Sequence, residues 1–186
     1  MSAAFSLRAV APEDGNPFER YPQLQTLWSP ALVLLAREAI DEAFLDQSEG
    51  IDCGTVFLVV DPDKADEVWG LTGFLPWPDG AGVLQRVGLR WHGLVVEHRG
   101  QGLSMAVLED VRARAHARYP MANHLVEFMP INAEHAATAE YFERVGFCRW
   151  GPPERVEWSD VLWQEYVCDI GVPLLLGPAA SGPAPS

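Results

Sequence analysis

The sequence contains little cysteine, and its cysteines follow no metal-binding or disulfide pattern. Cys53, Cys148 and Cys168 are the three cysteines among 186 residues, and none of them belongs to a C-x-x-C motif. An odd number of scattered cysteines argues against a disulfide framework, and the missing C-x-x-C spacing argues against a zinc site. We therefore expect neither a structural disulfide nor a bound metal.

Long hydrophobic runs are also missing. The longest apolar runs, such as Ala31–Ala36, are far shorter than the roughly 18 residues that a membrane-spanning helix requires. Residues 1–15 contain no basic segment followed by an apolar one, which is the pattern of a secretory signal. We expect a cytoplasmic protein that does not bind membranes.

Basic residues are scarce compared with acidic ones. The chain has 13 lysines and arginines against 26 aspartates and glutamates, which gives a formal net charge of −13. Such a surface repels phosphate backbones and anionic lipids, so general binding to nucleic acid or to membrane surfaces is disfavoured. A neutral or cationic partner is easier to accommodate.

The apolar content is sufficient for one folded domain. Hydrophobic residues make up 48% of the chain and charged residues 21%, and no repeat with a period of about 20 to 50 residues is visible. We assign residues 1–170 to a single domain. Residues 171–186 are rich in Gly, Pro, Ala and Ser, and this composition predicts a mobile C-terminal tail.

The hydrophobic patterns predict a mixed α/β fold. Ser29 and Pro30 are typical of a helix start, with Ser as the N-cap and Pro at the first helical position. The longest predicted strand is Val87–Val96. Other predicted strands are Phe5–Val10, Val56–Val60, Val68–Leu75, Leu125–Met129, Phe147–Trp150 and Leu162–Ile170, and Ala133–Arg144 is a predicted helix. Strands joined by helices in this order predict a mixed sheet with helical crossovers.

A further helix is predicted over Leu103–Arg118. Its helical spacing places one set of side chains inward and another outward. The inward set is Leu108, Val111 and Ala115, and the outward set is Glu109, Arg112 and Arg114.

The most informative segment is Gly93–Val111, where a predicted strand runs through a glycine-rich turn into this helix. Gly100 and Gly102 allow the backbone to bend so that successive N–H groups point into one concavity. The unpaired N–H groups and positive dipole of the first helical turn add to it, which suits a diphosphate. The segment lacks the G-K-[ST] ending of a P-loop and the G-x-G-x-x-G spacing of a dinucleotide fold. An ordinary glycine-rich turn remains the alternative.

Two motifs resemble the GNAT superfamily of N-acetyltransferases. Residues 99–104 (RGQGLS) resemble its R/Q-x-x-G-x-G/A signature, with Ser104 where the family prefers Gly or Ala. Residues 139–147 (AEYFERVGF) resemble its second landmark, a helix that reads roughly A-x-x-Y-x-x-x-G-F. The order of predicted elements over about residues 5–170 also agrees with this family.

The resemblance implies acetyl-CoA as co-substrate and a sheet of about seven strands, splayed between the fourth and fifth strands. The fourth strand would be Val87–Val96. Its backbone at Leu94, Val95 and Val96 would pair with the pantetheine arm, while the amides of Arg99, Gly100, Gln101, Gly102, Leu103 and Ser104 would hold the pyrophosphate. Asn132 resembles a polar residue that often touches the cofactor, and His98 is expected nearby.

The resemblance also implies proton-transfer residues, and here the sequence departs from the family. The usual acid position, four residues before Gly146, holds Phe142, and Tyr141 lies one residue earlier. Arg90 stands near the usual base position and cannot accept a proton. His92, which regular alternation would place on the same strand face as Arg90 and Leu94, is the first candidate for the base. Glu127 is the second candidate.

The implied function is therefore transfer of an acetyl group from acetyl-CoA to an amine of a small molecule or protein. An alternative is a catalytically weak acyl-CoA-binding module that senses or regulates. The acceptor is expected to be neutral or cationic, and a homodimer is one open arrangement. Trp28, Trp77 and Trp91 are candidates for the acceptor pocket, although core packing explains them equally. The resemblance places an acidic cluster over that pocket, although a solvated acidic face explains the cluster equally: Asp41, Glu42, Asp46, Glu49 and Asp52.

Overall fold

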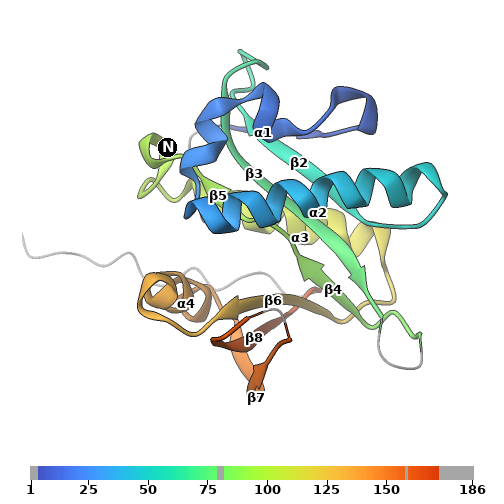
Figure 1. The fold of residues 1–186 in the computed structure, drawn as a ribbon, viewed down its shortest axis with the longest axis vertical. Coiled ribbons are helices and arrows are strands. Elements are labelled where there is room, and N and C mark those ends of the chain that lie inside the picture. Colours follow the sequence, from blue (N-terminus) through green and yellow to red (C-terminus); the bar gives the residue numbers. More distant parts are fainter. Residues whose placement is uncertain (1–3, 79–81, 158, 172–186) are drawn as a thin grey trace, which may run out of the picture.

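The computed structural model describes residues 4–78, 82–157 and 159–171. These residues form one mixed sheet with helices on both faces, as the sequence predicts (Figure 1). The tail that the sequence predicts lies, apart from Gly171, outside the described residues.

Eight strands of the described chain make up the sheet. Their order is β1-β2-β3-β4-β6-β8-β7, and β5 pairs with β3 beyond the end of β4. Neighbouring strands are antiparallel except β4 and β6, which are parallel. The strands are β1 (Ser6–Ala9), β2 (Thr55–Val60), β3 (Val68–Trp77), β4 (Arg86–Leu89), β5 (Gly93–Leu94), β6 (His124–Pro130), β7 (Cys148–Arg155) and β8 (Leu162–Asp169).

The helices occupy the positions that the sequence predicts, with short 3-10 turns added. Ser29 is the N-cap of α2 and Pro30 its first residue. The predicted helix Ala133–Arg144 begins with one 3-10 turn before it becomes α-helical. The α-helices are α1 (Pro17–Arg20), α2 (Pro30–Ser48), α3 (Leu103–Arg118) and α4 (Ala136–Arg144), and the 3-10 turns are η1 (Pro12–Asp14), η2 (Pro22–Thr26), η3 (Val96–His98) and η4 (Ala133–His135).

The prediction of one unbroken strand over Val87–Val96 is wrong, because a bulge divides it into β4 and β5. Arg90 still bonds to Gly73 of β3 through its N–H, and Gly93 is paired with Leu71. Residues 91 and 92 therefore oppose Thr72 alone, which is the two-against-one count of a β-bulge. Trp91 adopts a φ of 56°, a left-handed conformation that is rare for a bulky residue. This extra strand explains why the sheet has eight strands rather than about seven.

The bulge also corrects the expected strand faces. Leu89 and Leu94 pack into the same core cluster although they are five residues apart, which regular alternation forbids. The extra residue at the bulge shifts the alternation by one position. His92 and Leu94 therefore share the face that packs on α3, as predicted, whereas Arg90 lies on the opposite face against α2, so its predicted place beside them is wrong.

The sheet opens between β4 and β6, where the sequence predicts a splay. These two strands pair over three positions, from Arg86 opposite His124 to Gly88 opposite Val126. Beyond that point β4 bends into the bulge while β6 continues to Pro130 beside β8. The ion pair of Arg86 with Glu165, at 2.6 Å between Nη2 and Oε2, ties β4 to β8 at the closed end.

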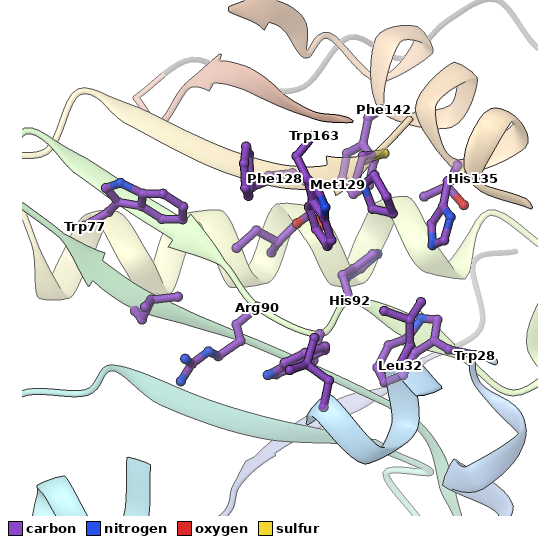
Figure 2. A pocket seen from close by; sticks show the side chains of 17 residues that line it. Trp28, Leu32, Trp77, Arg90, His92, Phe128, Met129, His135, Phe142 and Trp163 are labelled. Atoms are coloured by element: carbon purple, nitrogen blue, oxygen red, sulfur yellow. The ribbon is translucent and has the colours of Figure 1, made fainter. Parts of the chain in front are cut away.

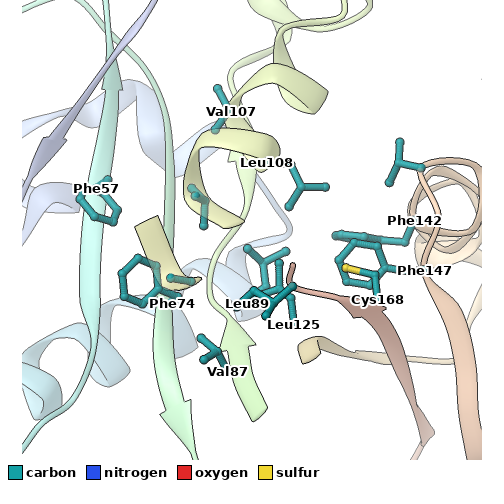
Figure 3. Close-up of a cluster of buried hydrophobic side chains, with 14 of the residues drawn as sticks. Phe57, Phe74, Val87, Leu89, Val107, Leu108, Leu125, Phe142, Phe147 and Cys168 are labelled. Atoms are coloured by element: carbon teal, nitrogen blue, oxygen red, sulfur yellow. The ribbon is translucent and has the colours of Figure 1, made fainter. Parts of the chain in front are cut away.

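Two hydrophobic clusters cover the two faces of the sheet. One cluster contains Val33, Ala36 and Ile40 of α2 packed on strand residues that include Leu58 and Leu71. The other joins α3 and α4 to both halves of the sheet (Figure 3). Figure 3 shows Phe57, Phe74, Val87, Leu89, Val107, Leu108, Leu125, Phe142, Phe147 and Cys168 meeting in this second cluster.

Arg112 is buried rather than facing outward, so that prediction is wrong. It lies four residues after Leu108 and therefore shares the inward face of α3. Its guanidinium donates to the carbonyl of Ile170 and, from Nη2 at 2.7 Å, to Oε2 of Glu109. The buried carbonyl at the end of β8 needs a donor, and Arg112 supplies it.

We expect Arg112→Met to lower the free energy of unfolding by about 2–3 kcal/mol, because the Ile170 carbonyl loses a charged donor. Arg114→Met on the same helix is the matched control, since Arg114 is exposed and pairs with Asp110 at 3.1 Å. That control should cost under about 1 kcal/mol. Urea denaturation measures both, and equal losses would contradict the role assigned to Arg112.

Candidate active site

A cavity of about 330 Å³ fills the opening between β4 and β6 (Figure 2). Its walls come from the turn before α2, from α2 itself, from β3, from the bulge, and from β6, α4 and β8. Aromatic and aliphatic side chains dominate these walls. The lining residues are Trp28, Leu32, Leu35, Leu75, Trp77, Leu89, Arg90, Trp91, His92, Glu127, Phe128, Met129, Pro130, His135, Thr138, Phe142 and Trp163.

The glycine-rich turn before α3 has the backbone of an anion cradle. Gly100 and Gly102 adopt φ values of 74° and 76°, and Gly102 is the N-cap of α3. A Cβ added at either glycine would meet no atom within 4 Å, so open space faces both positions. The first turn of α3 contains no acidic residue, which leaves its positive dipole uncompensated. These residues fit a diphosphate.

Several groups that are predicted to contact the cofactor already form hydrogen bonds within the protein. Arg99 donates from Nε to the Leu94 carbonyl at 2.7 Å and from Nη2 to the Leu27 carbonyl at 3.0 Å. The carbonyls of Val95 and Val96 accept the bonds of turn η3. The N–H of Val95 is engaged as well, because it donates to the Trp69 carbonyl at 2.8 Å, so Val95 offers a partner strand neither of its backbone groups.

Of the other residues in the predicted cofactor segment, some side chains are exposed to solvent and others are buried in the core. Gln101 is exposed and donates to the Glu97 carbonyl, whereas the side chain of Leu103 is buried in the core beneath α3. His98 stacks on Trp69 with ring centroids 4.5 Å apart. Leu103 can therefore contribute its backbone, but not its side chain, to a ligand in the cradle.

Four side chains from separate parts of the sequence form one hydrogen-bonded chain. Thr72 Oγ1 lies 3.1 Å from His92 Nδ1, His92 Nε2 lies 2.9 Å from Ser104 Oγ, and Ser104 donates to the Tyr141 hydroxyl at 2.9 Å. Because Ser104 gives its single proton to Tyr141, it accepts from His92 Nε2, and Nδ1 then accepts from Thr72. The hydroxyl proton of Tyr141 is left for a further acceptor.

The hydrogen bond at the end of this row of side chains fixes the orientation of Tyr141. The tyrosine lies one position from the usual acid position, yet its hydroxyl reaches Ser104 at the start of α3 and not solvent. Burial raises the pKa of Tyr141. Phe142, at the usual position, is buried between His92 and Phe147.

His92 is a neutral histidine with both ring nitrogens engaged. Burial lowers the pKa of His92 to about 4, against which the bond to Ser104 acts weakly. For His92 to take a proton directly from an acceptor amine, one of its two hydrogen bonds would have to break. The geometry therefore suits His92 better to orienting Ser104 and Tyr141.

Glu127 is the carboxyl group of the cavity. Its Oε2 atom is buried and has no hydrogen-bond partner in the described structure. Burial raises the pKa of Glu127 to about 8, because water no longer stabilises the charged form. A carboxyl group with a pKa near neutrality can exchange a proton with an amine.

The remaining predicted site residues lie differently. Asn132 caps η4, where its Oδ1 accepts from the backbone N–H of His135 at 3.0 Å. Figure 2 shows the Arg90 side chain pointing away from His92. Burial lowers the pKa of Arg90, which is only half-buried and carries no ion pair in the described structure. Neither Asn132 nor Arg90 approaches the hydrogen-bonded chain.

The expectation that an acidic cluster overhangs the cavity is wrong. None of the five acidic residues lines the cavity. Glu42, Asp46 and Asp52 line a separate hollow of about 170 Å³, and Asp52 also pairs with Arg118 at 2.6 Å. Asp41 instead accepts a bond from Asn16. Leu75 and Arg90 line both the hollow and the cavity, so the two spaces are neighbours.

Sequence reasoning missed Thr72, Phe128 and Trp163. Thr72 is fully buried, and a lone hydroxyl inside the apolar stretch VWGLTGFL was a signal that could have been used. Phe128 and Trp163 stack at 5.2 Å across β6 and β8. No pattern in the sequence relates those two residues, because their contact depends on strand order.

The described residues contain neither a metal-binding cluster nor a membrane-spanning helix. No group of three or more His, Cys, Asp or Glu side chains there is arranged to hold a metal ion. Among the helices of the same residues, none combines the length and the apolar character needed to cross a bilayer.

The shifted pKa of Glu127 has a consequence for stability. Between about pH 4.5 and 8, Glu127 keeps its proton in the folded protein but loses it in the unfolded chain. The free energy of unfolding of the wild type therefore falls as the pH rises through this range. Because glutamine does not titrate, Glu127→Gln removes this pH-dependent fall in the free energy of unfolding. We expect the variant to gain roughly 3 kcal/mol on wild type between pH 4.5 and 8, measured by urea denaturation. A pH-independent difference would mean that the buried carboxyl is ionised.

Comparison with known proteins supplies the fold family. No protein-family model matches the sequence, and no curated protein matches it. Solved structures do match. A protein from Desulfovibrio desulfuricans that is assigned to the GNAT acetyltransferases has a TM-score of 0.68 at 18% identity, over 90% of this chain and 99% of that one.

Two further structures give the same result. A GNAT family acetyltransferase from Elizabethkingia anophelis with acetyl-CoA bound has a TM-score of 0.59 at 14% identity, over 89% of this chain and 97% of that one. Mutant forms of the spermidine/spermine N-acetyltransferase of Vibrio cholerae have a TM-score of 0.58 at 12% identity, over 90% and 95%. The resemblance found in the two sequence motifs is thereby confirmed for the fold, and the chain has the fold of the GNAT acetyltransferases.

Proposed function

We propose that this protein transfers an acetyl group from acetyl-CoA to a primary amine in a ternary complex. The observation that carries the proposal is the hydrogen-bonded chain Thr72–His92–Ser104–Tyr141. It begins inside the sheet, lines the cavity at His92 and ends beside the cradle at the start of α3. In this proposal, Tyr141 is the proton donor for a thioester that the cradle holds and that an acceptor in the cavity attacks.

Acetyl-CoA supplies the activated acyl group as a thioester when bound. The cradle residues Gly100–Ser104 hold its pyrophosphate by backbone N–H groups and the dipole of α3. The opening between β5 and β6 admits the pantetheine arm. Because the carbonyls at residues 94–96 and the N–H of Val95 are occupied, the arm is held mainly by apolar contact.

The acceptor amine needs a base, and Glu127 is better placed for this than His92. Its carboxylate form takes a proton from the amine as the new N–C bond forms. The C–S bond then breaks, and the Tyr141 hydroxyl gives its proton to the sulfur. His92 and Ser104 stabilise the tyrosinate that results, since Ser104 donates to it and His92 donates to Ser104.

The second candidate function is an acyl-CoA-binding module without turnover. Two observations favour it: Phe142 stands at the usual acid position, and Arg90 stands near the usual base position. Tyr141 and Glu127 supply the same two proton-transfer functions from neighbouring positions, so we favour the enzyme.

Cofactor binding should depend on Gly102. In Gly102→Val the new side chain enters the open space in front of the cradle, and we expect CoA affinity measured by calorimetry to fall at least about tenfold. Gly50→Val is the matched control, because Gly50, just beyond the C-terminal end of α2, has a φ of 81° and equally open surroundings. It should share the backbone strain and keep CoA affinity. An equal loss in both variants would remove the cradle assignment.

Turnover should depend on the Tyr141 hydroxyl. With acetyl-CoA and a primary amine, we expect Tyr141→Phe to lower kcat by about 10² or more, because the thiolate loses its proton donor. CoA affinity should stay unchanged. Tyr21→Phe is the control, since that hydroxyl bonds only to Arg8 at the far side of the sheet. Thiol release measures both variants.

The two candidate functions separate in the same assay. Unchanged turnover in Tyr141→Phe would contradict the assigned proton donor. Tight CoA binding without thiol release for any amine would favour the binding module.

A further inference from the structure

We infer that the acceptor is a small hydrophobic amine with one basic nitrogen, such as an alkylamine or arylalkylamine, and not a polyamine or an acidic amine. The inference rests on the proposed function, because it assigns the cavity to the acceptor of that reaction. Three features of the cavity support it: the apolar walls, the small number of polar groups on them, and the charges nearby.

The cavity walls are aromatic and held rigidly. Four tryptophans and two phenylalanines line it, and they pack on one another in pairs. Trp28 lies 5.9 Å from Trp91, Trp77 lies 6.3 Å from Phe128, and Phe128 stacks on Trp163 at 5.2 Å, each measured between ring centroids. Such walls favour an apolar or aromatic body.

Beyond Arg90, His135 and Thr138, few of the described lining residues offer a polar atom to a ligand. Glu127 Oε2 is a buried acceptor without a partner, and the indole N–H of Trp91 is a buried donor without a partner. His92 is already bonded at both nitrogens. A buried polar atom left without a partner costs free energy, so a ligand nitrogen that bonds to Glu127 would recover it. The single carboxyl group of the described lining, that of Glu127, can pair with one basic nitrogen of the ligand.

Among the residues that the structure describes, no second carboxylate lines the cavity to compensate a second ammonium group. Glu42, Asp46 and Asp52 face the neighbouring hollow, and Arg90 lines both that hollow and the cavity. An ammonium moving toward those carboxylates would approach the guanidinium of Arg90 and be repelled. Among the tryptophans it would gain a cation–π contact, whose stabilisation is smaller than the cost of burying an ammonium without a counter-charge.

The volume also limits the acceptor. About 330 Å³ lies at the small end of ligand cavities, and the acetyl group must share it with the amine. A short alkyl chain or a single aromatic ring on a short linker is the size that remains.

Three amines of equal chain length test the inference: hexylamine, 1,6-diaminohexane and 6-aminohexanoate. We expect kcat/KM for hexylamine to exceed that for the diamine by on the order of 100-fold, because the diamine buries a second charge. The aminohexanoate should be as poor. Quenching of tryptophan fluorescence by each amine gives binding without turnover, since four tryptophans line the cavity.

A pair of variants on α2 tests the role of the apolar wall. Leu35 lines the cavity and is 37% exposed, whereas Leu34 beside it is 55% exposed and does not line it. Leu35→Glu places a carboxylate at the cavity and should shift the hexylamine-to-diamine ratio at least about tenfold toward the diamine. Leu34→Glu adds the same charge to the same helix and should leave the ratio unchanged.

The outcomes separate the two proposals. If no amine releases thiol while hexylamine still binds more tightly than the diamine, the proposed function fails and the cavity assignment stands. Diamine turnover or binding equal to that of hexylamine would overturn the inference. A preference for 6-aminohexanoate would also overturn it, since Arg90 would then be a carboxylate-binding residue. An equal shift in both variants would exclude the apolar wall as the cause.

Discussion

The short parallel contact between β4 and β6 is the constraint on which the site depends. Three paired positions join the two halves of the sheet, and the Arg86–Glu165 ion pair holds their closed end. Past Gly88, the bulge at Trp91 and His92 carries the chain away from β6, so the sheet opens without losing the hydrogen bonds between β3 and β5. The strained backbone of the bulge therefore creates the opening that forms the cavity, and it also places His92 in the cavity wall.

Burial then shifts the pKa values of two titratable groups of the cavity, His92 and Glu127, in opposite directions. The same removal of water lowers the pKa of His92 and raises that of Glu127, because each group resists its charged form. At neutral pH the cavity accordingly contains two largely uncharged groups. Near pH 8 the carboxyl group can exchange a proton, while the histidine remains a fixed member of the chain that ends at Tyr141.

Local patterns in the sequence predict most of the fold but not the geometry of the site. Helix α3 begins and ends where the spacing of Leu108, Val111 and Ala115 predicts, and the glycine turn before it is where the motif places it. The bulge could not be predicted, because an inserted residue changes strand faces without leaving a compositional sign. The same limit applies to contacts between distant segments, such as Thr72 with His92.

A crystal structure of the protein with CoA bound tests the central claim most directly. The account predicts the pyrophosphate against the backbone of Gly100–Ser104, the pantetheine arm between β5 and β6, and the sulfur within hydrogen-bonding distance of the Tyr141 hydroxyl. A CoA molecule bound outside this opening, or a sulfur remote from both Tyr141 and the cavity that Glu127 lines, would contradict it.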